Sequence, residues 1–263
     1  MIVLVDSHCH LHMLDLTADG NSLQPVIERA RVQGVHYILN VSVNMRDFPV
    51  IARISHTYPS IGLSVGVHPN ERDEEMDVAT LLRWGNEASV IAIGETGLDY
   101  FRSTGDLTWQ QERFRTHIRV AKQLNKPLIV HTRQAKDDTI SIMQEERANE
   151  VGGVMHCFTE DWPMAKQALD MGFYISFSGV VTFKNAHSVQ EVAKQVPLHR
   201  MLIETDAPYL APEPYRGKPN EPAYIRHTAD YLATLRGISI DEFARQTSNN
   251  FFSLFTGAVR PHV

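Results

Sequence analysis

The chain has 263 residues, 43% of them hydrophobic and 21% charged, with two cysteines. This composition is typical of a soluble globular protein with a large core, and it excludes a fold held together by a disulfide framework. The net charge of −6 argues against a general nucleic-acid or membrane-surface binder, so a polyanionic substrate would have to be held locally by a few basic side chains or by metal ions.

The sequence carries no sign of a membrane segment or an export signal. No run approaches the roughly 18 apolar residues of a transmembrane helix, and Met1 to Val5 is too short and lacks the basic start of a signal peptide. We therefore expect no membrane association and a cytoplasmic location. Because no linker, charge block or low-complexity run divides the chain, we expect residues 1–263 to form a single domain, and we expect a monomer.

Short apolar runs rich in β-branched residues alternate along the chain with segments of helical periodicity. In chain order, the predicted strands are Ile2–Val5, Tyr37–Val43, Ile61–Val67, Val90–Ile93, Leu128–His131, Gly153–Cys157, Phe173–Phe177 and Met201–Glu204. The predicted helices cover residues 23–30, 48–54, 81–84, 114–124, 140–143, 164–169, 189–196, 225–232 and 243–254.

This alternation predicts the fold class. Strands that are apolar on both faces and alternate with helices indicate a parallel sheet with helical crossovers. Eight repeats in a chain of this length predict a closed (β/α)8 barrel, the TIM barrel. The alternative is an open doubly wound sheet, which normally carries a glycine-rich phosphate loop after its first strand, where this chain has His8-Cys9-His10.

The carboxyl ends of the predicted strands carry histidines and acids, and in a barrel these ends form the functional rim. His8 and His10 lie two residues apart, so in an extended chain they project from one face. A single histidine at a strand end is more often structural than a ligand, but several strands here deliver candidates to the same rim. The candidates after the later strands are His68, Glu95, His131, His156, Glu204 and Asp206.

Together these residues predict a metal centre. Six ligands are too many for one catalytic ion with an open position, and they suit two divalent ions about 4 Å apart that share a carboxylate. We assign His8, His10 and Asp206 to one ion, His131 and His156 to the other, and Glu95 as the bridge. The ligand types leave Mg, Mn, Zn, Ni and Fe open. We expect the metals to lower the pKa of water to about 7 and Asp206 to accept its proton.

Three further side chains are expected near these ligands. Glu204 shares strand parity with Asp206, so it is either an additional ligand or, as we favour, a carboxylate that holds a ligand histidine. Asp6 shares parity with His8 and is either a similar support or a structural hydrogen-bond acceptor. For His68, a substrate contact and a structural place in the mouth remain equally open.

Basic and aromatic residues on the rim are candidates for substrate contacts. Arg133 follows His131 by two residues, so it should face the site and could clamp a phosphate. Arg216 and Lys218 lie in the loop 212–222, as a wall of the cleft or as ordinary solvated charge. Candidate stacking platforms for bases, or else core aromatics, are Tyr100, Phe101 and Tyr209.

These motifs, in this order, resemble the TatD family of metal-dependent hydrolases within the amidohydrolase-like superfamily. The matching segments are Asp6–Leu11, Gly66–Pro69, Ile93–Tyr100, Pro127–Arg133, His156–Phe158 and Glu204–Leu210. The resemblance implies a TIM barrel with two metal ions, and it implies the same ligands as above. Gln134, where an acidic residue commonly follows the arginine, and Thr159–Asp161, in place of a small glycine-containing turn, depart from the pattern.

The resemblance also implies an activity. Family members are described as deoxyribonucleases, often 3′ exonucleases, so we expect a metal-dependent phosphodiesterase that acts on DNA ends or single strands, with Glu95 and Asp206 as its catalytic acids. The alternative is a C–N or ester hydrolase of the amidohydrolase type, for example of aminoacyl-tRNA, on the same metal pair. A third hypothesis is a catalytically inactive barrel that binds a partner, which complete retention of the proposed ligands argues against.

Overall fold

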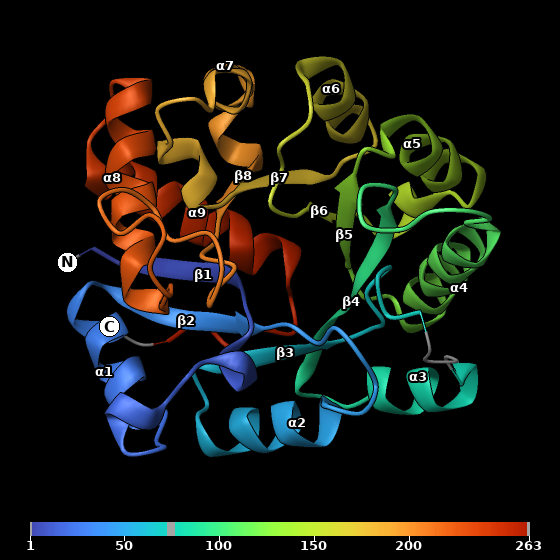
Figure 1. Ribbon diagram of the computed structural model, residues 1–263, viewed down its shortest axis with the longest axis horizontal. Coiled ribbons are helices and arrows are strands. Elements are labelled where there is room, and N and C mark those ends of the chain that lie inside the picture. The colour runs from blue at the N-terminus through green and yellow to red at the C-terminus, as the bar shows by residue number, and fades with distance from the viewer. Residues whose placement is uncertain (1, 73–76, 262–263) are drawn as a thin grey trace.

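The computed structural model describes residues 2–72 and 77–261, and its strands form one parallel sheet in which each strand pairs with the next along the chain (Figure 1). The strands are β1 (Leu4–Cys9), β2 (Val35–Asn40), β3 (Ile61–Val65), β4 (Val90–Asp99), β5 (Leu128–Arg133), β6 (Gly153–Met155), β7 (Tyr174–Phe177) and β8 (Met201–Ile203). The ring closes where Asp206 N–H donates to His8 O (2.9 Å) and His10 N–H donates to Ala207 O (2.8 Å). The predicted TIM barrel is confirmed.

Helices follow the strands as the periodicity predicts. They are α1 (Gln24–Val32), α2 (Phe48–Thr57), α3 (Val78–Gly85), α4 (Thr108–Leu124), α5 (Lys136–Glu145), α6 (Trp162–Asp170), α7 (His187–Gln195), α8 (Ile225–Arg236) and α9 (Ile240–Leu254). Local signals set their limits: Ser239 caps the start of α9 by accepting from Glu242 N–H, and Asn125 ends α4 in a left-handed conformation. None of the helices in the described part of the chain is long and apolar enough to cross a membrane.

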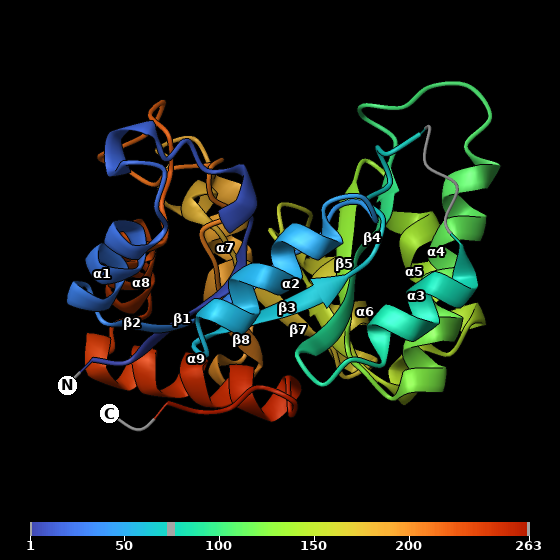
Figure 2. The same cartoon turned by 90° about the horizontal axis from the view of Figure 1, so that it is seen from below.

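The apolar residues form two cores. The larger one lies between the strands and the surrounding helices. The smaller one fills the barrel itself, with one or two residues from most strands, and Phe251 and Phe255 of α9 complete it. Figure 2 shows α9 running across one end of the barrel, while the loops after β1, β4 and β8 rise at the other. The floor of the barrel is therefore sealed, and the opposite end is left for a site.

A buried histidine joins the end of β3 to α4. His117 Nε2 accepts the N–H of Val67 (3.0 Å), and its Nδ1–H donates to Arg113 O (2.8 Å). Both bonds use the neutral ring, and burial lowers the pKa of His117 from 6.5 to about 4.

Acid should therefore destabilise the fold through His117. The pKa of His117 is lower in the folded chain than in the unfolded chain. Its contribution to the free energy of unfolding is therefore complete above pH 6.5, and it is lost between pH 6.5 and about 4, where the unfolded chain takes up the proton. The full loss is roughly 3 kcal/mol. Urea unfolding of the wild type and of His117→Gln, which can still accept the Val67 N–H, should show a smaller pH slope in the variant. Equal slopes would contradict this role.

Candidate metal centre

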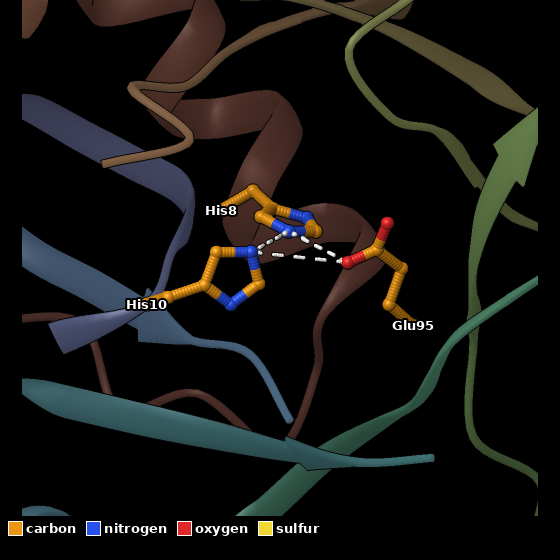
Figure 3. Close-up of side chains that lie close together, drawn as sticks. All are labelled: His8, His10 and Glu95. Atoms are coloured by element: carbon orange, nitrogen blue, oxygen red, sulfur yellow. Dashed lines mark hydrogen bonds and ion pairs between the residues drawn. The ribbon is translucent and has the colours of Figure 1, made fainter. Parts of the chain in front are cut away.

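His8 of β1 and His10, which follows directly after the strand, face each other at the open end of the barrel. The Nε2 atoms of His8 and His10 are 3.2 Å apart (Figure 3). Nδ1–H of His10 donates to Val41 O (2.9 Å), which leaves the lone pair on Nε2 and turns it toward its neighbours. The His-x-His pattern therefore delivers two ring nitrogens to one point, as predicted from the extended backbone.

The carboxylate of Glu95 lies at the centre of the cluster. Its Oε2 is 3.3 Å from His8 Nε2 and 3.9 Å from His10 Nε2. Its Oε1 faces three other rings, at 2.9 Å from His156 Nε2, 3.1 Å from His131 Nδ1 and 3.3 Å from His68 Nε2. The two oxygens of one side chain thus divide the imidazoles into two groups.

Asp206 joins the first of these groups. Its Oδ1 is 3.3 Å from His10 Nε2 and 3.7 Å from His8 Nε2. Its side chain is 14% exposed, compared with 4% for Glu95, so of the two acids it is the more open to solvent. The structure thus brings together His8, His10 and Asp206 on one side of Glu95, and His131 and His156 on the other, in the grouping assigned from the sequence.

Glu204 supports a histidine of the cluster. Its Oε1 accepts from His156 Nδ1 (2.9 Å), which directs His156 Nε2 toward Glu95. The rings of His8 and His156 are stacked, with centroids 3.8 Å apart and 15° between their planes. The hydrogen bond between Glu204 and His156 fits the favoured interpretation, a carboxylate that orients a ligand histidine.

Asp6 lies at the seam of the barrel, where its Oδ1 accepts from the backbone N–H of His8 (3.4 Å). Its oxygens accept from Thr205 N–H (2.8 Å) and Thr205 Oγ1 (2.5 Å), so its side chain joins β1 to the segment after β8. The shared parity with His8 does not hold, because the pairing of β1 with β2 shifts register between Asp6 and Cys9. Of the two roles considered for Asp6, the geometry fits the structural acceptor.

His68 lies closer to the cluster than a general position in the mouth would require. Asn70 N–H donates to its Nδ1 (3.1 Å), so the neutral ring carries its proton on Nε2, which faces Glu95. In that tautomer His68 offers a hydrogen bond rather than a lone pair, which fits a substrate contact better than a metal ligand.

Asp99 has no role in the sequence-based assignment, yet it holds a histidine of the cluster. Its Oδ2 is 3.2 Å from His131 Nε2, and it also accepts from Asn70 Nδ2 (2.9 Å). A proton on Nε2 leaves the lone pair of His131 on Nδ1, toward Glu95. The available signal was strand parity, since Glu95, Gly97 and Asp99 alternate along β4.

The basic candidates lie outside the cluster. The Arg133 guanidinium covers the ring of Phe101, 3.8 Å from its centroid. Arg216 lies over Phe183 at 4.2 Å, and Lys218 lies over Tyr215 at 5.8 Å. No ion pair to a carboxylate is formed by these three cations among the described residues, so their charges are available to an anion.

The acids and rings of the cluster shift one another's pKa. Burial opposes the ionisation of Glu95, but the surrounding rings, His156 first, outweigh it and hold its pKa well below the ordinary range. Burial likewise opposes protonation of His156, but the carboxylates of Glu95 and Glu204 raise its pKa well above the ordinary range. Glu95 is therefore negatively charged in this site, and the pKa values of the imidazoles around it depend on that charge.

The comparisons with known proteins show the family of the chain. The family model for TatD related DNase matches residues 5–256. The chain belongs to the TatD family. It is 45% identical to the metal-dependent hydrolase YcfH of Escherichia coli (strain K12) over 96% of this chain and 95% of that protein. It is 31% identical to a TatD of Klebsiella pneumoniae named as a 3′-5′ ssDNA/RNA exonuclease, over 88% and 90%.

Solved structures give the same result. The TatD homologue YjjV of Escherichia coli K12 superposes with a TM-score of 0.86 at 26% identity, over 96% of this chain and 98% of that one. The chain is thus a metal-dependent hydrolase of the TatD family, and its eight-stranded barrel is the one found in that homologue.

The residues of this TatD protein fit divalent metal. Three overlapping groups have ligand atoms within 4.8 Å of one another: His8, His10 and Glu95; His8, His156 and Glu204; and His68, Glu95 and His131. The Nε2 atoms of His8 and His10 share at most one proton across their 3.2 Å separation, so at least one lone pair is directed at a common point. Imidazole and carboxylate donors of this kind suit Zn, Mn, Fe and Ni, and with fewer imidazoles Mg.

Proposed function

We propose that this chain is a nuclease that uses two divalent metal ions to remove nucleotides from the 3′ end of single-stranded DNA. The observation that carries the proposal is the place of Glu95, whose two oxygens each face a separate group of imidazoles. A carboxylate between two such groups would help to hold a pair of divalent ions, which would stabilise both the attacking and the leaving oxygen of a phosphodiester.

The proposed ligands follow the two sides of Glu95. His8, His10 and Asp206 would hold one ion, and His131 and His156 would hold the other. Glu204 and Asp99 would fix the rings of His156 and His131, so that the nitrogen facing Glu95 keeps its lone pair. When bound, the ions supply positive charge to the phosphate and acidify water.

The other side chains act on the proton and the phosphate. Asp206 is the more exposed acid of the cluster, and its Oδ1 would take the proton from the attacking water and pass it to the leaving oxygen. The Nε2–H of His68 and the guanidinium of Arg133 would bind phosphate oxygens. Arg216 and Lys218, in the segment after β8, would guide the strand toward the site.

The substrate class draws support from the relative of Klebsiella pneumoniae, which is named for 3′-5′ cleavage of single-stranded DNA and RNA. The net charge of −6 argues against a broad basic surface for nucleic acid, so affinity would come from the metals and the few cations at the rim. All the proposed ligands lie in one chain, so we also propose that residues 1–263 work as a single domain and as a monomer.

The test is nucleotide release from a single-stranded oligonucleotide labelled at its 5′ end. With Mg or Mn, we expect products that shorten one nucleotide at a time from the 3′ end, and we expect a chelator to stop the reaction and added metal to restore it. A panel of carboxylic esters and amides run beside it addresses the alternative. Hydrolysis of that panel, with no release from DNA under any divalent metal, would replace this proposal by a C–N or ester hydrolase.

A further inference from the structure

Two exposed aromatic rings lie at the mouth of the barrel. Among the Phe, Tyr and Trp residues in the described ranges, Phe101 at 52% and Tyr209 at 54% are the only ones more than half exposed. Leaving an aromatic ring in water forgoes the free energy of burying it. Phe101 follows β4 and Tyr209 follows β8, and residues of the candidate metal centre lie on or just after these two strands. The exposure of the two rings at this place points to a ligand that covers them.

Phe101 forms a flat platform that is fixed to the metal centre. Its N–H donates to Asp99 Oδ1 (3.0 Å), and Asp99 Oδ2 lies 3.2 Å from His131 Nε2. The Arg133 guanidinium covers the ring at 3.8 Å from its centroid. Since one carboxylate holds both a ligand histidine and the loop of Phe101, the stacked pair has a set place relative to the reacting phosphate.

Tyr209 is tied to the other side of the centre. It lies three residues after Asp206, and its N–H donates to Asp206 O (2.9 Å). Asn220 Nδ2 donates to Tyr209 O (2.7 Å), and the ring centroid is 6.4 Å from that of His10. In Figure 2 the loop after β4 and the loops after β1 and β8 rise on opposite sides of the same end of the barrel.

We propose that the two nucleotides flanking the scissile phosphate are bound by base stacking, one on Tyr209 and the other on Phe101 with Arg133. This inference rests on the proposed nuclease function and specifies how it selects its substrate. Every base has a π face, so such platforms accept any sequence. Two bases drawn to opposite sides of the metals can neither stack on each other nor stay paired, so the substrate must be single-stranded at the site of cleavage.

The charges at the site favour a dinucleotide over a purely apolar ligand. The face between the two rings carries the proposed ions, Arg133 and the donor Nε2–H of His68. A purely apolar ligand would bring no anion to these groups, whereas a dinucleotide places a phosphate among them and a flat base on each side. The rings and the cations are therefore complementary to the same ligand.

The experiment measures binding and stacking without turnover. A short single strand with a phosphorothioate at its 3′-terminal linkage, which resists cleavage, carries the fluorescent base 2-aminopurine at its last or next-to-last position. Stacking quenches this base, so the metal-loaded protein should quench both positions. Tyr209→Ala should abolish quenching at one position and Phe101→Ala at the other, each with binding weakened about tenfold or more, the effect of losing one base stack.

Conservative variants keep the test independent of folding. Tyr209→Phe and Phe101→Tyr should keep wild-type quenching and affinity, because a π face remains. Val32→Ala, which truncates an 82% exposed side chain at the end of α1, should change neither. Unchanged quenching and affinity in both alanine variants, with DNA cleavage by the wild type intact, would overturn the stacking inference and leave the nuclease proposal standing. No binding and no cleavage by the wild type with any divalent metal would overturn both.

Discussion

Glutamine in place of Glu95 is expected to remove both metal ions and nearly all activity. The substitution keeps the size of the side chain but removes the negative charge that faces His8 and His10 through one oxygen and His131 and His156 through the other. Loss of metal forfeits several kcal/mol of transition-state stabilisation, so the rate of DNA hydrolysis should fall by roughly 10³-fold or more.

Metal content and turnover should be measured on the same samples of Glu95→Gln. Elemental analysis should give about two ions per chain for the wild type and less than one for the variant. Glu191→Gln on α7, which removes an acid with a 63% exposed side chain far from the cluster, serves as the matched control. A variant that binds two ions and turns over like the wild type would rule out a bridging role for this carboxylate.

Asparagine in place of Asp206 is expected to slow the reaction and to retain more bound metal than Glu95→Gln does. Asparagine keeps an oxygen beside His10 and His8 but cannot accept a proton from water. Loss of a general base typically costs about 10²- to 10⁴-fold, and the loss should appear in kcat with little change in KM.

Steady-state kinetics on single-stranded DNA, with metal analysis of the same protein, separate the two roles of Asp206. A fall in kcat with most of the metal retained supports proton transfer by its carboxylate. Wild-type kcat in Asp206→Asn would contradict the proposed proton transfer, and the base would then have to be sought elsewhere on the rim.

The order of strands and helices can be predicted from the sequence, because short apolar runs and segments of helical periodicity alternate along the whole chain. Each predicted strand and helix is present, although β1 reaches Cys9 and β4 reaches Asp99, beyond the apolar runs that predict them. The polar ends of these two strands carry His8 and Glu95, whose side chains turn into the site instead of the core. In these two strands the hydrophobic run marks only the part that packs, whereas the predicted Gly153–Cys157 and Met201–Glu204 extend past the observed ends of β6 and β8.

The gathering of histidines and acids at one end of the barrel could also be predicted from the sequence, because carboxyl ends of barrel strands meet at one rim. Its details could not. The register shift in β1 moves Asp6 out of phase with His8, and no residue pattern announces such a shift. The tautomer of His68 depends on the Asn70 N–H, a backbone donor that only the folded loop brings to the ring. Asp99 acts through His131, so its importance appears only when the distance between them is known.

The closing of the barrel floor by α9 bears on how the protein is made. Phe251 and Phe255 complete the interior formed by residues from most of the strands, Val5 of β1 and Leu202 of β8 among them, and Ser248 Oγ donates to Val3 O (2.8 Å) near the start of the chain. During synthesis the inner face of β1 is therefore fully covered only after α9 has left the ribosome. Until then these apolar side chains of the incomplete barrel are exposed, and exposed apolar surface of this kind promotes aggregation of folding intermediates.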